Sequence, residues 1–286
     1  WLVGSRNGEL IAVSSKSNEI LWRTPVPSEI LARPVVYNNN MVLVRTADGQ
    51  ILGVDIETGK INWNYSKTIP ALTLRGSSSP ILSRSHFYTG LESGRLIAMS
   101  PIDGEVAWDI ALTVPEGRSE IQRLVDIDGK SELYGRVLYA ASYHGRMAAI
   151  DVTRGQFLWA RSFSSNTGVS VGTDAVYSSD DRSHVWALDR NNGATLWKQD
   201  KLQARSVTRP VIYQDFLVVG DFEGYVHVMS RFDGRFVARA QVDSDGILVP
   251  PIVDGDRLLV LSRDGYLAAY SIRESVQYSD EELFDE

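Results

Sequence analysis

One sequence pattern recurs seven times along the chain, and this repeat constrains the fold more than any other feature. Five copies align in register and end in tryptophan: residues 7–22, 48–63, 93–108, 144–159 and 182–197. A sixth copy, residues 223–238, ends in alanine, and an incomplete seventh begins at Asp264. The first glycine position of successive copies recurs every 38 to 51 residues. A period near 40 residues with turn-forming glycines is typical of propellers and solenoids.

Each repeat predicts four short β-strands and no helix. In the second copy, β-prone runs cover residues 34–37, 41–45, 50–56 and 60–63, with turn-forming residues between them. Four antiparallel strands repeated about a centre form a β-propeller, in which only short strand edges stay exposed. The closing tryptophan falls on the outermost strand, where we expect it to fill the gap between neighbouring blades.

The strand count predicts an incomplete eight-bladed propeller. The first copy begins inside its second strand, at residues 1–5, and the last copy, with runs at 251–253, 258–261 and 265–271, lacks a fourth strand. A closed propeller completes its last blade with a strand from the other terminus, so a seven-bladed ring lacking different strands at its two ends is unexpected. The alternative is a seven-bladed ring in which residues 275–278 form an outer strand.

The predicted fold class is therefore all-β, with four-stranded antiparallel blades of the quinoprotein-like kind. A single propeller domain covers residues 1–273 and contains about seven of the eight blades. Residues 274–286 form an acidic tail. Because the chain begins with Trp1, we expect the missing blade to lie in an N-terminal segment that precedes it.

The composition argues against several classes of function. The net charge is −7, and lysines and arginines are scattered singly, which disfavours a nucleic-acid backbone as partner. The absence of cysteine excludes disulfides, thiolate nucleophiles and cysteine-ligated metal centres. No stretch approaches the roughly 18 apolar residues of a membrane helix.

The titratable residues form no recognisable catalytic or metal-binding motif. The four histidines, His86, His144, His184 and His227, fall singly in separate repeats, and we expect them in turns or at the surface. Asp126 and Asp128 precede a glycine, as in a calcium loop, but the third ligand and distal glutamate of an EF-hand are absent. We predict no catalytic residue, no cofactor and no metal site.

Two consecutive connections between repeats are longer than the others. The next predicted blade begins 10 to 13 residues after the outer-strand position at most junctions, but 17 residues after Trp63 and 23 after Trp108. Connections that exceed the minimum of a repeat carry function, and consecutive blades place them side by side. Their apolar and charged residues alternate: Leu72, Leu74, Arg75, Glu120, Ile121, Arg123, Leu124, Asp126 and Asp128. This mixture favours a protein-recognition surface; the alternative is local packing of the leucines beneath their own loops.

Three further motifs carry a family resemblance. They are PALTLRG at residues 70–76, SEIQRLVDID at 119–128 and GDFEGYVHVMSRFDGRFVA at 220–238. Together with the tryptophan-ended repeats, they resemble the BamB family of outer-membrane assembly lipoproteins over essentially the whole chain except the acidic tail. The resemblance implies an eight-bladed propeller held by an N-terminal lipid anchor at the periplasmic face of the outer membrane of a Gram-negative bacterium.

The resemblance also implies a non-enzymatic accessory subunit of the outer-membrane β-barrel assembly machinery, the BAM complex, which supports folding and insertion of outer-membrane proteins. The implied partner is the POTRA domains of BamA, contacted through Leu72, Leu74, Arg75, Asp126 and Asp128, and we extend this surface to Glu120, Ile121 and Arg123. The aspartates either accept hydrogen bonds from partner arginines or hold Arg75 or Arg123 in position. Unfolded outer-membrane proteins are a further candidate partner, held at blade edges by strand addition.

Two alternatives remain at the level of sequence. A quinone-cofactor dehydrogenase shares the tryptophan-ended repeat, but that family has a longer chain, a vicinal cysteine pair and a central calcium site. Another extracytoplasmic propeller that binds a different protein or a glycan fits the same repeat.

Overall fold

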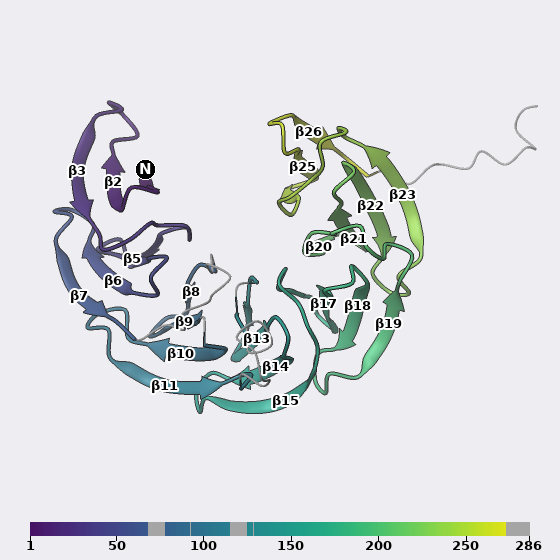
Figure 1. Ribbon diagram of the computed structural model, residues 1–286, viewed down its shortest axis with the longest axis horizontal. Helices are drawn as coiled ribbons and strands as arrows, with labels where there is room; N and C mark the ends of the chain where they lie inside the picture. The colour runs from purple at the N-terminus through teal and green to yellow at the C-terminus, as the bar shows by residue number, and fades with distance from the viewer. Residues whose placement is uncertain (68–77, 92, 115–124, 128, 273–286) are drawn as a thin grey trace, which may run out of the picture.

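The computed structural model describes residues 1–67, 78–91, 93–114, 125–127 and 129–272, and their regular structure is all β. In these residues 26 strands form seven antiparallel sheets, five with four strands and the first and last with three. The sheets follow one another along an arc, with the first sheet (purple) and the last (yellow) at its two ends (Figure 1). The predicted fold class, with seven blades represented, is confirmed.

The strands of the first four sheets are β1 (Leu2–Gly4), β2 (Glu9–Val13) and β3 (Ile20–Pro25); β4 (Val35–Tyr37), β5 (Met41–Arg45), β6 (Ile51–Asp55) and β7 (Ile61–Tyr65); β8 (Ile81–Leu82), β9 (Phe87–Gly90), β10 (Arg95–Met99) and β11 (Val106–Ala111); β12 (Glu132–Tyr134), β13 (Val137–Ala141), β14 (Arg146–Asp151) and β15 (Gln156–Ser162). Those of the last three are β16 (Val169–Val171), β17 (Ala175–Ser179), β18 (Val185–Asp189) and β19 (Thr195–Gln199); β20 (Val211–Tyr213), β21 (Phe216–Gly220), β22 (Tyr225–Ser230) and β23 (Phe236–Gln241); β24 (Ile252–Asp254), β25 (Arg257–Leu261) and β26 (Leu267–Tyr270). The predicted runs of the second and last repeats match these bounds to within two residues. Residues 275–278, the alternative outer strand, lie outside the described residues.

The core lies in the middle strands of the sheets. All five residues of β5 are buried, whereas the outermost strands β7 and β23 are largely exposed on the rim of the arc (Figure 1). Apolar clusters join each sheet to the next, such as the cluster that links Tyr88 and Leu96 to Leu138 and Ile150. Each blade is therefore stabilised mainly by its neighbours, as in other repeat proteins.

A polar side chain caps the turn between the second and third strands of most blades. Oxygens of Ser5, Ser142, Asp180, Asp221 and Ser262 each accept the backbone N–H four residues later, at 2.8 to 3.1 Å. In three of these turns a glycine with a positive φ follows, Gly8, Gly224 or Gly265 (φ 74° to 89°), which suits a residue without a side chain, whereas His144 and Ser183 take the positive φ in the other two. The repeat thus encodes its own hairpins.

Five tryptophans link the blades at five of the six junctions. The indole Nε1–H of Trp22, Trp63, Trp108, Trp159 and Trp197 donates to a backbone carbonyl of the next blade, that of Ile56, Pro101, Val152, Arg190 and Arg231 respectively, at 2.9 to 3.2 Å. Each ring also lies against a turn glycine of that blade. A Cβ on Gly59, Gly104, Gly155, Gly193 or Gly234 would come within 2.5 to 2.7 Å of the ring. The predicted filling of the gap between blades is confirmed.

The sixth junction lacks this contact because Ala238 replaces the tryptophan. There the Tyr213 hydroxyl donates to the carbonyl oxygen of Asp256 at 2.5 Å. A buried cluster that includes Val228, Leu258 and Val260 packs across the same junction. At this junction the cluster and the Tyr213 hydroxyl stand in place of the tryptophan contact.

Replacing Gly155 by alanine is expected to destabilise the protein more than replacing Gly135. Both glycines have a positive φ, 63° and 61°, so both variants carry a similar backbone cost of about 1–2 kcal/mol. A Cβ at position 155 would lie 2.7 Å from the Trp108 ring, whereas no atom lies within 4 Å of one at position 135. Gly155→Ala should therefore lose about 1–3 kcal/mol more in urea unfolding. Equal losses would show that the tryptophan contact contributes nothing.

Candidate functional site

The two enlarged connections join β7 to β8 and β11 to β12, in neighbouring blades. The predicted contact residues Leu72, Leu74, Arg75, Glu120, Ile121, Arg123 and Asp128 lie outside the described residues. Asp126 is described, as are the residues at which both connections leave and rejoin the blades. These residues determine where the two loops are held.

The first connection begins at an ion-pair network on the rim of the next blade. Lys67 Nζ lies 2.7 Å from Asp109 Oδ2, and Arg95 Nε lies 2.6 Å from Asp109 Oδ1. Burial acts to raise the pKa of the Asp109 carboxyl, but hydrogen bonds from Lys67 and Arg95 outweigh it and lower the pKa. The carboxylate therefore stays charged and joins the loop to β11.

The first connection ends against buried polar groups. Arg45, which is 1% exposed, donates from Nη1 to Ser78 Oγ at 2.8 Å. The next hydroxyl, Ser79 Oγ, accepts the backbone N–H of Arg33 at 3.1 Å. Both contacts join the loop to the preceding blades, so its end has a fixed place.

The second connection is held at both ends as well. Thr113 Oγ1 lies 2.8 Å from Ser142 Oγ and accepts the Arg146 N–H at 3.1 Å. At the far end Ile127 is fully buried, and a Cβ on Gly90 would come within 2.5 Å of it, so glycine is needed at position 90. The connection is therefore held at Thr113 on one side and at Ile127 on the other.

The backbone of Asp126 occupies a position that recurs in five blades. Its carbonyl oxygen accepts the Tyr143 N–H at 2.8 Å. The same link joins Glu29 to Ala47, Ser164 to Asp181, Arg205 to Phe222 and Gly246 to Arg263, at 2.8 to 3.1 Å. Asp126 itself is 1% exposed, so its carboxylate is enclosed within the protein. The described end of the motif is thus a regular blade-to-blade junction with an acidic side chain turned into the interior.

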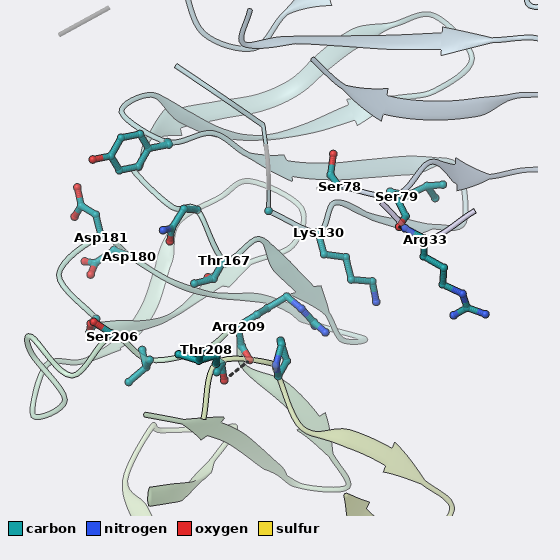
Figure 2. Close-up of a pocket in the computed structure, with 18 of the residues that line it drawn as sticks. Arg33, Ser78, Ser79, Lys130, Thr167, Asp180, Asp181, Ser206, Thr208 and Arg209 are labelled. Atoms are coloured by element: carbon teal, nitrogen blue, oxygen red, sulfur yellow. Dashed lines mark hydrogen bonds between the residues drawn. The ribbon is translucent and has the colours of Figure 1, made fainter. Parts of the chain in front are cut away.

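The described ends of both loops meet at one cavity. Ser78 and Ser79 from the first connection and Lys130 from the second line it together with residues of later blades (Figure 2). Lys130 also forms a β-bridge with Gly168, where a Cβ on Gly129 would lie 2.3 Å from the Gly168 nitrogen. Gly129, which followed the aspartates in the sequence motif, is explained by this close approach of two backbones. Sequence gave no signal for Lys130 because its neighbours in the cavity come from other repeats.

Two of the four histidines are buried, so the expectation that they lie in turns or at the surface is wrong for His184 and His227. They are 6% and 3% exposed. His184 Nδ1 lies 2.8 Å from Asp180 Oδ2, and His227 Nε2 lies 2.7 Å from Asp221 Oδ2. The expectation holds for His144, which is exposed in a turn, and for the half-buried His86. Pairing with an aspartate six or fewer residues away satisfies the buried imidazoles.

Asp221 is the centre of the more extensive of these clusters. Its Oδ2 accepts from His227 and, at 2.6 Å, from Arg205 Nε, while Oδ1 accepts the backbone N–H groups of Glu223 and Tyr225. Burial acts to raise the pKa of the Asp221 carboxyl, but hydrogen bonds from His227, the Tyr225 amide and Arg205 lower it to about 2. The carboxylate acts as a structural anion that holds its hairpin and the preceding loop.

Among the described residues, no three histidine, aspartate or glutamate side chains gather where they could hold a metal ion. The part of the chain that the structure describes also contains no apolar helix of membrane-spanning length.

Comparison with known proteins identifies relatives over most of the chain. The sequence profile of a family described as outer membrane protein assembly factor BamB matches residues 1–199 and 191–277. The protein of that name from Shewanella oneidensis is 34% identical over 270 residues, which cover 94% of this chain and 68% of the relative. The one from Pseudomonas aeruginosa is 44% identical over 206 residues, or 72% of this chain and 54% of the relative.

Solved structures agree with the sequence relatives. The crystal structure of BamB from Moraxella catarrhalis superposes with a TM-score of 0.88 at 30% identity, over 95% of this chain and 81% of that one. The C-terminal WD40 domain of Sif2 superposes with a TM-score of 0.72 at 14% identity, over 96% of this chain and 78% of that domain, and shares the fold alone.

Replacing Asp221 by asparagine is expected to destabilise the protein and flatten its acid stability profile. The ionised Asp221 carboxylate is bonded only in the folded state, so it stabilises the folded protein above pH 4. This contribution is lost as the carboxyl is protonated between about pH 4 and about pH 2. Both carboxylate oxygens accept hydrogen bonds from N–H groups, so the NH₂ group of an asparagine would replace one of these acceptors with a donor. We expect a loss of about 1–2 kcal/mol at pH 7 by urea unfolding. The exposed Asp215 in the same sheet provides the control, since Asp215→Asn should change stability by less than about 0.5 kcal/mol; an equal loss in both variants would contradict the assignment.

Proposed function

The chain belongs to the BamB family of outer-membrane protein assembly factors, and from this premise we propose that it is a non-enzymatic subunit of the β-barrel assembly machinery that binds the POTRA domains of BamA. The observation that best supports this binding surface is the pair of enlarged connections in neighbouring blades. Their described ends are anchored by hydrogen bonds and meet at one cavity. A rigid scaffold that presents two adjacent loops suits binding, and their mixture of apolar and charged residues favours a protein partner.

The leucines of the first loop supply the apolar part of the proposed interface. Leu72 and Leu74 would each contribute about 1.5–3 kcal/mol if fully buried against an apolar groove of the partner. Arg75 would add forked hydrogen bonds to a carboxylate or to backbone carbonyls. Glu120, Ile121 and Arg123 extend the same surface onto the second loop.

The two aspartates have different roles in this proposal. Asp126 is buried and its backbone belongs to a blade junction, so we assign it a positioning role within the protein. Asp128 is the member of the pair that we assign to contact with the partner. We therefore propose one role for each aspartate.

The family also supports the proposed location. We place the protein at the periplasmic face of the outer membrane, held by a lipid anchor, as the family resemblance implies. Its binding to BamA would support folding and insertion of outer-membrane proteins. Unfolded outer-membrane proteins remain a second proposed partner.

Replacing Leu72 and Leu74 together by glutamate should abolish binding to the POTRA region of BamA. Four buried methyl groups would be exchanged for two charges that an apolar groove cannot solvate. We expect an affinity loss of at least a hundredfold by isothermal titration calorimetry, with an unchanged urea midpoint. Asp128→Ala should weaken binding without loss of stability, and Asp126→Ala should lower both.

Leu158 and Leu196 provide a matched control for the leucine variant. They are 56% and 52% exposed on β15 and β19, away from the two enlarged connections. Their double replacement by glutamate should leave the affinity at the wild-type level. Wild-type binding by the Leu72 and Leu74 variant would refute the proposed surface.

A further inference from the structure

A large cavity lies where the loops between blades turn into the innermost strands. Its volume is about 890 Å³, and the residues that line it come from the starts of six consecutive blades and from the hairpins beside them. Figure 2 shows its lining side chains pointing toward a shared space from several loops. Among the described residues, its lining includes none of those assigned to contact with BamA.

Three cations line this cavity from three separate blades. Each lies two residues before the innermost strand of its blade: Lys130 before β12, Arg209 before β20 and Arg33 before β4. The Lys130 amine and the Arg209 guanidinium point into the same part of the cavity, with Arg33 farther along the same side (Figure 2). These three basic residues are far apart in the sequence, but the curved arrangement of the blades brings them to one cavity.

The positive charge of this cluster is not balanced by ion pairs with the described residues. Within this part of the chain, no carboxylate lies at salt-bridge distance from Lys130, Arg209 or Arg33. Arg209 Nη1 donates only to neutral oxygens, the Ser170 hydroxyl and the Pro210 carbonyl.

The acidic residues of the cavity do not neutralise the cluster. Asp180 and Asp181 lie on its opposite side (Figure 2). Asp180 Oδ2 already accepts from His184 and, at 2.8 Å, from Trp186 Nε1. Asp181, beside it, is exposed to solvent. The positive side of the cavity thus faces one internally bonded carboxylate and one solvated carboxylate, neither of which forms an ion pair with the three cations among the described residues.

The two central cations also disfavour each other. Burial lowers the pKa of the Lys130 amine, and the charge of Arg209 lowers it further, against an opposing effect of Glu132. Burial likewise lowers the pKa of the Arg209 guanidinium, again opposed by Glu132. Placing two like charges in a partly desolvated space is unfavourable unless an anion joins them.

We propose that this cavity is an oxyanion-binding site, in which Lys130 and Arg209 bind the charged oxygens of a phosphate or carboxylate group and Arg33 adds a third donor. Arginine presents a planar fork that matches such groups, and lysine adds a mobile point charge. Hydroxyl groups on the same side, those of Ser79 and Thr208, add polar lining. The cavity includes the ends of both enlarged connections, but none of its described residues is among those assigned to contact with BamA. Loss of anion binding and loss of BamA binding can therefore be tested with different variants.

The test is titration of the intact chain with inorganic phosphate and, separately, with acetate, at constant ionic strength set by chloride. We expect a saturable heat of binding for at least one of the two anions. The anion that binds more tightly shows whether the site prefers a phosphate or a carboxylate group. Lys130→Gln and Arg209→Gln should each weaken that binding at least tenfold, whereas Lys130→Arg should retain it. Arg136→Gln, at an exposed arginine outside this cavity, should bind as the wild type does.

Thermal unfolding provides the second measurement. Without added anion, Lys130→Gln should be at least as stable as the wild type, because one of two repelling charges is gone. With anion, the wild type should gain stability as the site fills, and Lys130→Gln should not. Absence of saturable binding of both anions, or equal weakening in Arg136→Gln, would overturn the proposal.

Discussion

The contact between an outer-strand tryptophan and the turn glycine of the next blade is the interaction on which the rest of the structure depends. A four-stranded sheet of this kind cannot bury its two faces alone, so its stability comes from the neighbouring sheets. The indole satisfies three needs at one point: it fills the gap, its N–H binds a carbonyl of the next blade, and its ring excludes any side chain from the glycine. Repeated at five junctions, this contact sets the spacing of the blades and the curvature of the arc.

Because the blades are fixed in this way, the connections between them are free to differ. Short connections repeat a backbone link such as that of Glu29 to Ala47, and the enlarged second connection keeps the same link at Asp126. The extra residues are inserted between anchors, so a loop can grow without disturbing the strands. This explains how one regular fold can present the proposed partner surface on two blades and a polar cavity at the ends of the same connections.

Most of the fold could be predicted from sequence. The repeat gave the blade, the alternation of each run gave the strands to within two residues in the repeats compared, and the turn residues gave the hairpins. Predictions for individual polar residues were less successful. His184 and His227 were expected in turns or at the surface, yet each is buried and bonded to an aspartate of its own hairpin. Of the predicted contact surface only Asp126 is described, and it is buried, which the sequence did not indicate.

The sequence by itself determined the features that lie within one repeat: the strands, the capped turns, the tryptophan and glycine positions, and the two connections of unusual length. These depend on hydrogen bonds and side-chain alternation over some 40 residues, which a linear pattern records. The tertiary structure alone decided which side chains from different repeats converge. Lys130 and Arg209 are 79 residues apart in sequence, and only the curvature of the packed blades brings them to one cavity.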